Sequence, residues 1–531
     1  MLAVTDWRWI SMNLMYRTLL ATVALAVSSV TASAETITVC ASGCDYTSIN
    51  AAIDAASDGD VIQLAAETYF EGEQIDTLGK AITLRGVLDK AGEPASVLDG
   101  AGTHRVLICQ GGETNATLFE NLLIKNGFSV QNGGGLLIQA SGPTVQQCVF
   151  LSNLAFDGGG VFNGAGSEPT FRKCRFESNQ CVRWAGGIAN FSGSAPLVLE
   201  CVFVDNRASN AAGGGVRNSE SGNVVFEDCR FESNSALYAA GMSNSRATGL
   251  RLTRCEFVSN VSQVNGGGLL NFESPAVVEY CVFTSNRASN GGGFYDIGEN
   301  AGVDFDHCDF SDNVGSDDGG GVWFRGNDPA FVSCTFSGNF AACTGYDCGR
   351  GGAVFFQSSS PLFDGCDFVS NSGSAGGAVF AFSGGGAFDH CEFRGNQAVL
   401  GNGGALLNRD SSPGMSSCVF EENSASTGFS LAIFNEGVSR PAITNCMFLE
   451  CCQIAPPNSF IDGGNIFAGN PYSACDICRA DISCDTTVNS ADLGLLIGAW
   501  GTSDSQCDIN GDGTVSAADL GLLIGAWGPC Q

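Results

Sequence analysis

The chain has few basic side chains. Among its 531 residues, 24 are Lys or Arg and three are His, against 55 Asp or Glu, so the formal net charge is −31. A surface of this charge repels polyanions, which excludes nucleic acid and anionic membranes as its main partners. It favours a soluble surface that binds cations.

Beyond its N-terminus the chain also lacks long apolar runs. Arg17 precedes the apolar run 19–27, and a small-residue cleavage sequence follows at 32–34. The run is too short to span a bilayer, so the pattern predicts a secretory signal peptide over residues 1–34 and no transmembrane segment. We therefore expect an exported protein, either secreted or associated with the cell surface.

Glycine and cysteine, by contrast, are abundant, with 72 and 25 copies. Twelve Cys-x-Phe triplets recur at intervals of 25 to 32 residues, and eleven of them end with Asn five residues after the Cys. The twelve cysteines are Cys148, Cys174, Cys201, Cys229, Cys255, Cys281, Cys308, Cys334, Cys366, Cys391, Cys418 and Cys446. One coil earlier, residues 121–126 fit the same frame, with Asn121 in the Cys position.

The local pattern of each repeat is typical of strands. Frequent glycine and short alternating apolar runs argue against a helical repeat. Each unit instead predicts three short strands, as in 158–163, 169–171 and 174–176. Recurrence of the same positions predicts an all-β parallel β-helix of about 13 coils, with Cys and Phe pointing inward. The Asn is expected at a turn, where its amide forms a ladder and tolerates a strained backbone.

The repeat divides the chain into segments. After the signal peptide we expect an N-terminal cap and the first coils over 35–105, because Ile49, Ala52, Ile53 and Ala56 form an apolar helical stripe. The repeats then occupy 106–452, and a last partial coil and linker occupy 453–479. A separate module follows over 480–531.

The cysteines fall into two groups. In-register neighbours in the ladder are about 4.8 Å apart, wider than a disulfide prefers, so the twelve repeated cysteines are predicted to be buried thiols. Cys40 and Cys44 are disulfide candidates, and so are Cys343 and Cys348, which lie in the one enlarged interval.

The repeat also carries a family resemblance. Gly-Gly-[Ala/Gly]-aliphatic segments alternate with Phe-x-x-Asn over residues 121–450. This pattern resembles the repeats of the chlamydial polymorphic outer-membrane proteins and related right-handed β-helix proteins. The resemblance implies a right-handed parallel β-helix and, because those surface proteins are adhesins, a binding role.

The C-terminal module contains two copies of ADLGLLIGAWG, at 491–501 and 518–528, each preceded by an acidic loop. In the second loop Gly513 stands at position 6, where a calcium loop turns sharply. Its candidate ligands are Asp508, Asn510, Asp512, the Thr514 carbonyl, Ser516 and Asp519. The first loop offers Asp481, Ser483, Asp485, Thr487, Asn489 and Asp492. Thr486 replaces the glycine there, which predicts a weaker calcium site.

Duplicated calcium loops, each followed by one helix, resemble a type I dockerin over residues 480–531. The resemblance implies a small all-α calcium-binding domain that docks onto a cohesin-like protein. Ser490-Ala491 and Ala517-Ala518 depart from the Ser/Thr pair common in cellulosomal dockerins, which leaves the partner open. A calcium-stabilised C-terminal cap without a partner is the alternative.

The rod contains one candidate ligand face. The residue after each glycine turn is apolar and must face inward, so the next residue should face outward. At that place four consecutive coils carry Tyr295, Trp323, Phe355 and Phe380. They predict an exposed aromatic strip, suited to stacking on sugars or to contact with a protein. Alternatively, the rings pack on one another or lie under the loop that holds Cys343 and Cys348.

No motif of a polygalacturonase or a pectate lyase is present, so no catalytic residue is assigned. His307 and His390, both in FDHC, are expected to be exposed turn residues, and Asp317-Asp318 is expected to shape a turn. The leading interpretation is a non-catalytic β-helix for adhesion or polysaccharide binding. A polysaccharide lyase or glycoside hydrolase, and a structural envelope protein, are the alternatives.

Overall fold

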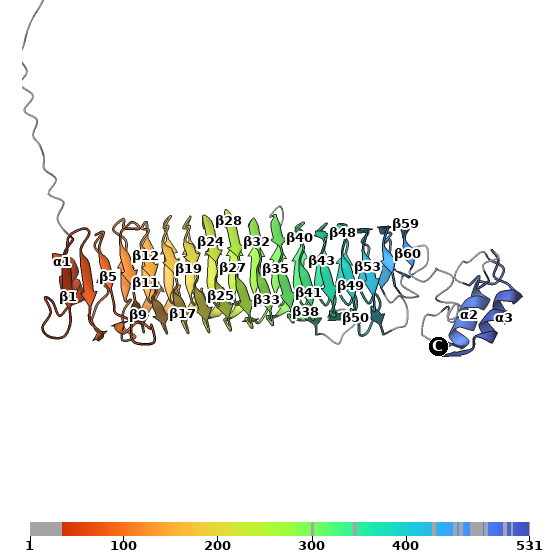
Figure 1. Cartoon of the computed structure of the whole chain (residues 1–531), viewed down its shortest axis with the longest axis horizontal. Helices are drawn as coiled ribbons and strands as arrows, with labels where there is room; N and C mark the ends of the chain where they lie inside the picture. Colours follow the sequence, from red (N-terminus) through yellow and green to blue (C-terminus); the bar gives the residue numbers. More distant parts are fainter. Residues whose placement is uncertain are drawn as a thin grey trace, which may run out of the picture.

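The computed structural model describes residues 34–298, 302–342, 348–426, 432–449, 454–455, 460–467, 480, 482, 487–502, 507–510 and 513–529. These residues form a long rod of short parallel strands and a small module with two helices (Figure 1). The all-β parallel β-helix is thereby confirmed. None of the helices in the described residues is long and apolar enough to cross a membrane.

A complete coil contains four strands. In one coil these are β16 (Thr170–Arg172), β17 (Arg175–Glu177), β18 (Gln180–Trp184) and β19 (Ile188–Phe191). Three strands per unit were predicted, so β18 is an addition. The sequence pattern misses this strand because the residues that follow each Asn vary, and the apolar ones buried in this sheet, such as Cys181, Ala208 and Ala236, are small.

Stacked coils build four parallel sheets, named here in their order within a coil. The first sheet runs from β1 (Thr36–Val39) to β59 (Ile461–Gly463), and the second from β3 (Thr68–Tyr69) to β60 (Ile466–Phe467). The third runs from β10 (Phe128–Asn132) to β54 (Ser424–Ala425), and the fourth from β4 (Ile75–Asp76) to β58 (Ile454–Ala455). Among the described residues the fourth sheet has 15 strands, which indicates about 15 coils rather than 13. The difference arises because the first coils lack the Cys-x-Phe repeat.

Single residues with left-handed backbone make the corners between strands. Lys173 (φ 53°) separates β16 from β17, and Ser178 (φ 55°) separates β17 from β18. The strained backbone therefore falls on the residue before Asn179, and not on the Asn as predicted. Left-handed φ turns the chain within one residue, at a cost of about 1 to 2 kcal/mol that the surrounding coils must offset.

The Asn ladder itself is confirmed. Asn179 donates through Nδ2 to the Phe150 carbonyl (2.9 Å) and to Oδ1 of Asn206 (3.0 Å). Its backbone N–H also donates to Oδ1 of Asn206, over 3.1 Å. The same pattern repeats from Asn153 to Asn396, so each buried amide is satisfied by the coils on either side.

Stacked phenylalanines fill the core. The rings of the second sheet form an unbroken column, with spacings such as 4.8 Å between Phe257 and Phe283. All twelve ladder cysteines are buried free thiols, as predicted. The predicted disulfide between Cys40 and Cys44 is present, with an S–S distance of 1.98 Å. Cys348 is disulfide-bonded, whereas Cys343 lies outside the described residues.

The frame of the coil that precedes the repeats differs by one residue from the prediction. Leu123 pairs with Val149, so Leu122, and not Asn121, lies in the Cys position. Asn121 and Asn126 take the two left-handed corner positions, with φ of 58° and 53°. Leu122 is fully buried, so this register places an apolar side chain in the core.

The predicted cap is present as α1 (Ile49–Ala55), with Ile49, Ala52 and Ile53 buried against the first coils. Glu71 accepts hydrogen bonds from the Ile49 N–H (2.7 Å) and the Ser48 hydroxyl (2.7 Å) at its N-terminus. Lys80 donates through Nζ to three carbonyls at the other end, including Ala56 at 2.9 Å. Both charges complement the helix dipole.

Candidate functional site

The second acidic loop has the backbone geometry of a calcium loop. Gly513, at position 6, takes φ 88° and donates its N–H to Oδ2 of Asp508 (2.7 Å). Asp519, at position 12, accepts from the N–H groups of Asn510 (2.9 Å) and Ser516 (2.7 Å). The first and last carboxylates are both buried and directed at the same turn. Burial opposes ionisation of Asp519, but these N–H donors outweigh it and lower its pKa.

The two helices of the module begin in the same way. α2 (Ser490–Gly498) and α3 (Ala517–Gly525) each start with a capping box, formed by Asn489 with Asp492 and by Ser516 with Asp519. The position-12 carboxylates therefore also fix the helix N-termini. One helix per loop, as the duplicated sequence predicts, is confirmed.

Each loop pairs with the segment that follows the other helix. β61 (Thr487–Val488) is antiparallel to β62 (Gly528–Pro529), which follows α3. In the other half, the Val515 N–H donates to the Thr502 carbonyl (2.9 Å), just after α2. The two halves thus support one another around an apolar centre that contains Val488, Val515, Leu496 and Leu523.

The donor set fits calcium. The described part of the second loop supplies two carboxylates, an amide, a hydroxyl and a backbone carbonyl, all oxygen donors of the kind this ion prefers. The described part of the first loop supplies Thr487, Asn489 and Asp492. Four predicted ligands, Asp481, Ser483, Asp485 and Asp512, lie outside the described residues. The calcium sites therefore remain a prediction.

The module exposes several large apolar side chains that the sequence analysis did not identify. Six side chains, three from each copy of the repeat, are between 42% and 58% exposed: Leu495, Ile497, Trp500, Leu522, Ile524 and Trp527. A pocket of about 410 Å³ beside α2 is lined in part by Gly494, Leu495 and Gly498. The identity of the two eleven-residue copies is the sequence signal that points to this surface.

The predicted aromatic strip is present as a stack but is not exposed. Tyr295, Trp323, Phe355 and Phe380 follow one another at ring spacings of 4.5, 5.8 and 5.6 Å. Their exposed fractions are only 7, 9, 2 and 0%, so the prediction of exposed rings is wrong. The rings pack on one another with Leu407, which agrees with the alternative considered from the sequence.

The cause of this burial is the sharp turn between the third and fourth sheets. The glycine turn folds back over the outer face of the next strand, so that a Cβ on Gly319 would be 3.1 Å from the Trp323 Cβ. Arg350 then covers Phe355 and Phe380 at 5.0 and 5.3 Å, and it is fixed by an ion pair with Asp318 (2.6 Å). The strip therefore offers no open ring face to a ligand.

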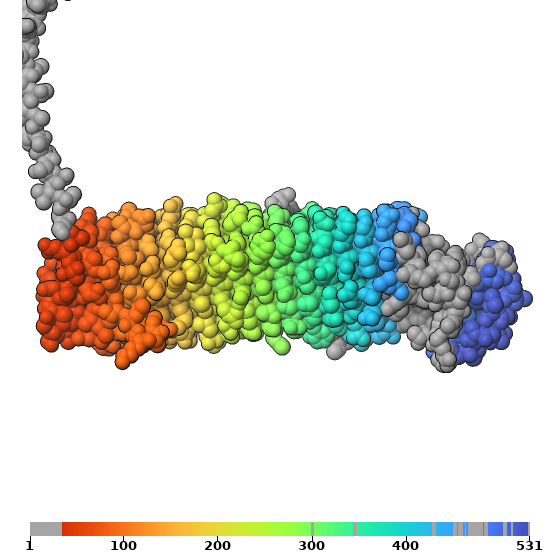
Figure 2. Space-filling view, in the orientation of Figure 1, coloured from red at the N-terminus to blue at the C-terminus, as the bar shows by residue number. Residues whose placement is uncertain are grey.

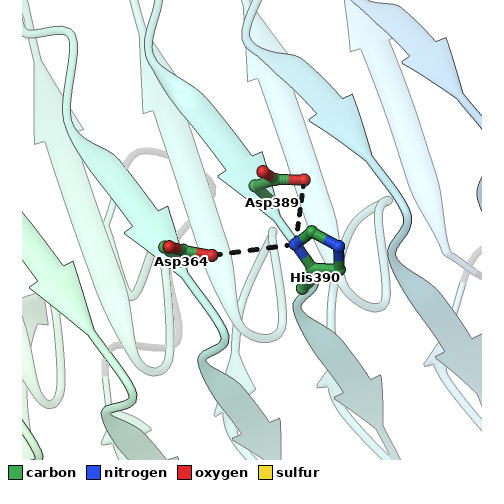
Figure 3. Close-up of side chains that lie close together, drawn as sticks. All are labelled: Asp364, Asp389 and His390. Carbon is green, nitrogen blue, oxygen red and sulfur yellow. Dashed lines mark ion pairs between the residues drawn. The ribbon is translucent and has the colours of Figure 1, made fainter.

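One His-containing acidic group is found among the described residues. Asp364, Asp389 and His390 approach one another at the corner between the first and second sheets (Figure 3). His390 Nδ1 lies 3.3 Å from Asp389 and 3.8 Å from Asp364. Asp364 and Asp389 are half exposed and His390 is exposed. In a second Asp-His pair His307 contacts Asp306 at 2.7 Å. Ion pairing accounts for both groups, and both histidines are exposed turn residues, as predicted.

Comparison with known families agrees with this geometry. Residues 107–274 and 340–470 match the family described as the right-handed β-helix region, which covers more than half of the chain. The chain belongs to the right-handed β-helix family. Residues 479–526 match the dockerin type I domain, so the C-terminal module is of dockerin type. The resemblance to polymorphic outer-membrane proteins has no separate support. Among curated proteins, none matches the chain.

Solved structures show only distant likeness to this β-helix protein. Tailspike protein 3 of bacteriophage CBA120 is 11% identical, with a TM-score of 0.44 over 75% of this chain, which spans only 57% of the tailspike chain. The catalytic domain of a GH87 α-1,3-glucanase is 11% identical, with a TM-score of 0.29 over 82% of this chain and 69% of its own. The PL6 alginate lyase AlyGC is 8% identical, with a TM-score of 0.16 over 78% of this chain and 96% of its own. These likenesses are too weak to transfer a ligand or an activity.

Proposed function

We propose that the chain is an exported β-helical rod for adhesion or polysaccharide binding, retained by a calcium-dependent docking module. The observation that carries this proposal is the set of exposed apolar side chains in and just after α2 and α3, on a dockerin-type fold. A domain of this size rarely exposes so many large apolar side chains unless they bind a partner. The partner proposed is a cohesin-like protein, at the cell surface or in a secreted assembly.

Glycines inside the two helices support docking. Gly494 and Gly521 lie inside α2 and α3, where each glycine costs about 1 kcal/mol relative to alanine, and Gly498 and Gly525 end the same helices. A Cβ at any of the four would meet no atom within 4 Å. Packing inside the module therefore does not explain why these positions are glycine. Close approach of a partner to the helix backbone would explain it, because a side chain would then be in the way.

Calcium bound in the two loops would hold α2 and α3, and therefore their exposed apolar side chains, in place. Oxygen ligands from the loops would hold one ion in each half, where the negative carboxylates otherwise repel one another. Because Asp492 and Asp519 also cap α2 and α3, a bound ion fixes the direction in which both helices leave their loops. Removal of calcium should therefore loosen the apolar surface and release the partner.

The test measures retention of the full chain on immobilised cohesin-type domains, with calcium and with a chelator. We expect retention only with calcium, and loss of retention in an Asp508→Ala variant. The double variant Gly494→Ala, Gly521→Ala should raise the unfolding temperature of the module, since each change removes a helix penalty of about 1 kcal/mol. It should nevertheless weaken docking, because the added methyl groups obstruct close approach.

Retention that is indifferent to calcium, or unchanged by the two added methyl groups, would contradict the docking proposal. A calcium-stabilised end module without a partner would then remain.

The rod presents a long continuous side that suits an extended polymer (Figure 2). The same full chain should be screened against acidic and neutral polysaccharides, and each reaction should be read for retention and for new chain ends. We expect retention without product. New reducing or unsaturated ends would instead establish the polysaccharide lyase or glycoside hydrolase alternative. Absence of both signals would favour a structural envelope role.

A further inference from the structure

One arginine interrupts an otherwise apolar or small series on the fourth sheet. The outward residue after each glycine turn is Phe162, Ala189, Arg217, Ser243 and Leu270 in five successive coils. Arg217 lies on β23 (Val216–Ser219) and is partly buried under the glycine turn, so that a Cβ on Gly213 would be 2.9 Å from its own Cβ. A charged side chain at this covered position requires an explanation.

The guanidinium of Arg217 has few partners. It lies 4.0 Å from the ring centre of Trp184, which precedes it by one coil. Nη1 donates to the Ser243 hydroxyl over 2.9 Å, and the buried Nε meets no acceptor. Stacking on Trp184 stabilises the charge of the guanidinium, but it provides no hydrogen-bond acceptor for the N–H groups that do not contact Ser243.

Arg105 shows what a structural arginine looks like in this chain. Its guanidinium donates to four acceptors, the carbonyls of Gly133 and Asn132 and the side chains of Gln74 and Ser129. Three of these contacts are 2.9 Å or shorter. The Arg217 guanidinium, by contrast, donates to one acceptor, the Ser243 hydroxyl. Hydrogen bonding within the protein therefore does not explain why an arginine occupies this covered position.

No ion pair between Arg217 and a carboxylate is found among the described residues. Burial lowers the pKa of Arg217 to about 10, so it stays charged at neutral pH. The charge of Asp157 favours the charged form of Arg217, but this carboxylate is itself bound by Arg183, at 3.0 and 2.6 Å. The positive charge of Arg246 also lowers the pKa of Arg217. Arg246 itself pairs with Glu220 and Glu273 at 3.7 and 3.6 Å. A covered charge without an ion pair of its own is costly, which makes the position favourable for an incoming anion.

Two aromatic residues flank this position. Trp184, Ala212 and Tyr238 are the last residues before the glycine turn in three successive coils. Ala212 is small and buried, whereas Tyr238 is 40% exposed and Trp184 is partly exposed. The guanidinium of Arg217 stacks on the ring of Trp184, and an arginine whose plane is fixed in this way is suited to hold an anionic group.

We propose that Arg217 is the centre of a binding site for one oxyanion, a carboxylate or a sulfate group. The guanidinium supplies charge-assisted hydrogen bonds, and Trp184 fixes its plane. The anion comes either free from solution or as a substituent of an acidic polysaccharide.

The experiment compares the full chain with Arg217→Gln. Binding of sulfate, acetate, dextran sulfate and neutral dextran is measured by calorimetry and by thermal shift, with chloride added to equal ionic strength. We expect Arg217→Gln to weaken anion binding roughly 10- to 100-fold, the effect of losing hydrogen bonds from a charged donor. Arg251→Gln is the matched control, because Arg251 is exposed and pairs with Glu279 at 2.9 Å. It should bind as the wild type does.

The results separate the two sources of the anion. Binding of free sulfate or acetate that depends on Arg217 identifies a small-anion site, and binding of dextran sulfate alone identifies a polymer site. Equal binding by wild type and Arg217→Gln, or no binding of any anion, overturns the proposal. Without an anion, Arg217→Gln should melt no lower than the wild type, because an uncompensated charge has been removed. A lower melting temperature that no anion shifts in the wild type would indicate a purely structural arginine. None of these results depends on whether residues 480–531 dock.

Discussion

A buried amide ladder on the inner face of the fourth sheet ends in a carboxylate. Asn244 donates through Nδ2 to Asn271 (2.8 Å), and Asn271 donates to Oδ1 of Asp296 (3.0 Å). Asn327 donates to the other carboxylate oxygen, Oδ2, over 2.8 Å. Burial raises the pKa of Asp296 from 3.8 to about 6, although these two amides favour the charged form. The substitution Asp296→Asn removes the charge and keeps the shape.

The magnitude follows from the pKa. A rise of about two units is worth about 3 kcal/mol, since each unit corresponds to about 1.4 kcal/mol. The folded state binds the proton more tightly than the unfolded state does. Below pH 3.8 the Asp296 carboxyl is protonated in both the folded and the unfolded state and does not affect the free energy of unfolding. As pH rises from 3.8 to about 6 the free energy of unfolding falls progressively, and above pH 6 the loss is complete. Asp296→Asn should be more stable by up to about 3 kcal/mol at pH 7, and about equal at pH 4. Asn327 must turn its amide to accept from the new Nδ2, which reduces the gain.

Urea unfolding of wild type and variant at half-unit steps from pH 4 to pH 8 measures this difference. Asn435→Asp provides a matched test in the opposite direction, because Asn435 is buried and accepts from Asn408 (2.8 Å) as Asp296 accepts from Asn271. It should acquire the same loss of stability with rising pH. A stability difference between Asp296→Asn and wild type that stays constant across this range would refute the reasoning.

Three further predictions follow from the core and the cap. Asn260→Ala should destabilise the rod by roughly 3 to 5 kcal/mol, because Asn260 and its ladder neighbours lose several buried hydrogen bonds; a loss below 1 kcal/mol in urea unfolding would contradict the ladder's role. The twelve ladder thiols should resist a water-soluble thiol reagent in the native protein and react only in denaturant, and rapid native labelling counted by mass spectrometry would show that they are accessible. Lys80→Met should raise amide exchange in α1 and cost about 1 to 2 kcal/mol, since three carbonyls lose their donor; unchanged exchange would show that packing alone holds the cap.

Several features of the molecule could be predicted from local sequence. The Cys-x-Phe spacing identified the inward residues of the second sheet, because in a solenoid the same position meets the same neighbours in every coil. The stripe of Ile49, Ala52 and Ile53 identified the cap for the same kind of reason, since helical periodicity places them on one face. The loop positions of Asp508 and Asp519 were readable because the geometry of a calcium loop is contained within twelve residues.

The sequence alone did not determine which outward positions are covered. Alternation along β39 (Val322–Arg325) correctly turns Trp323 away from the core, but only the path of the preceding glycine turn decides whether solvent reaches it. That path depends on corner residues such as Ala185, whose left-handed φ no repeat pattern reveals. The same turn hides Tyr295 and Phe380 and covers Arg217. Burial of these side chains is a property of the tertiary structure, because each is covered by the path of its own glycine turn together with side chains of the neighbouring coils.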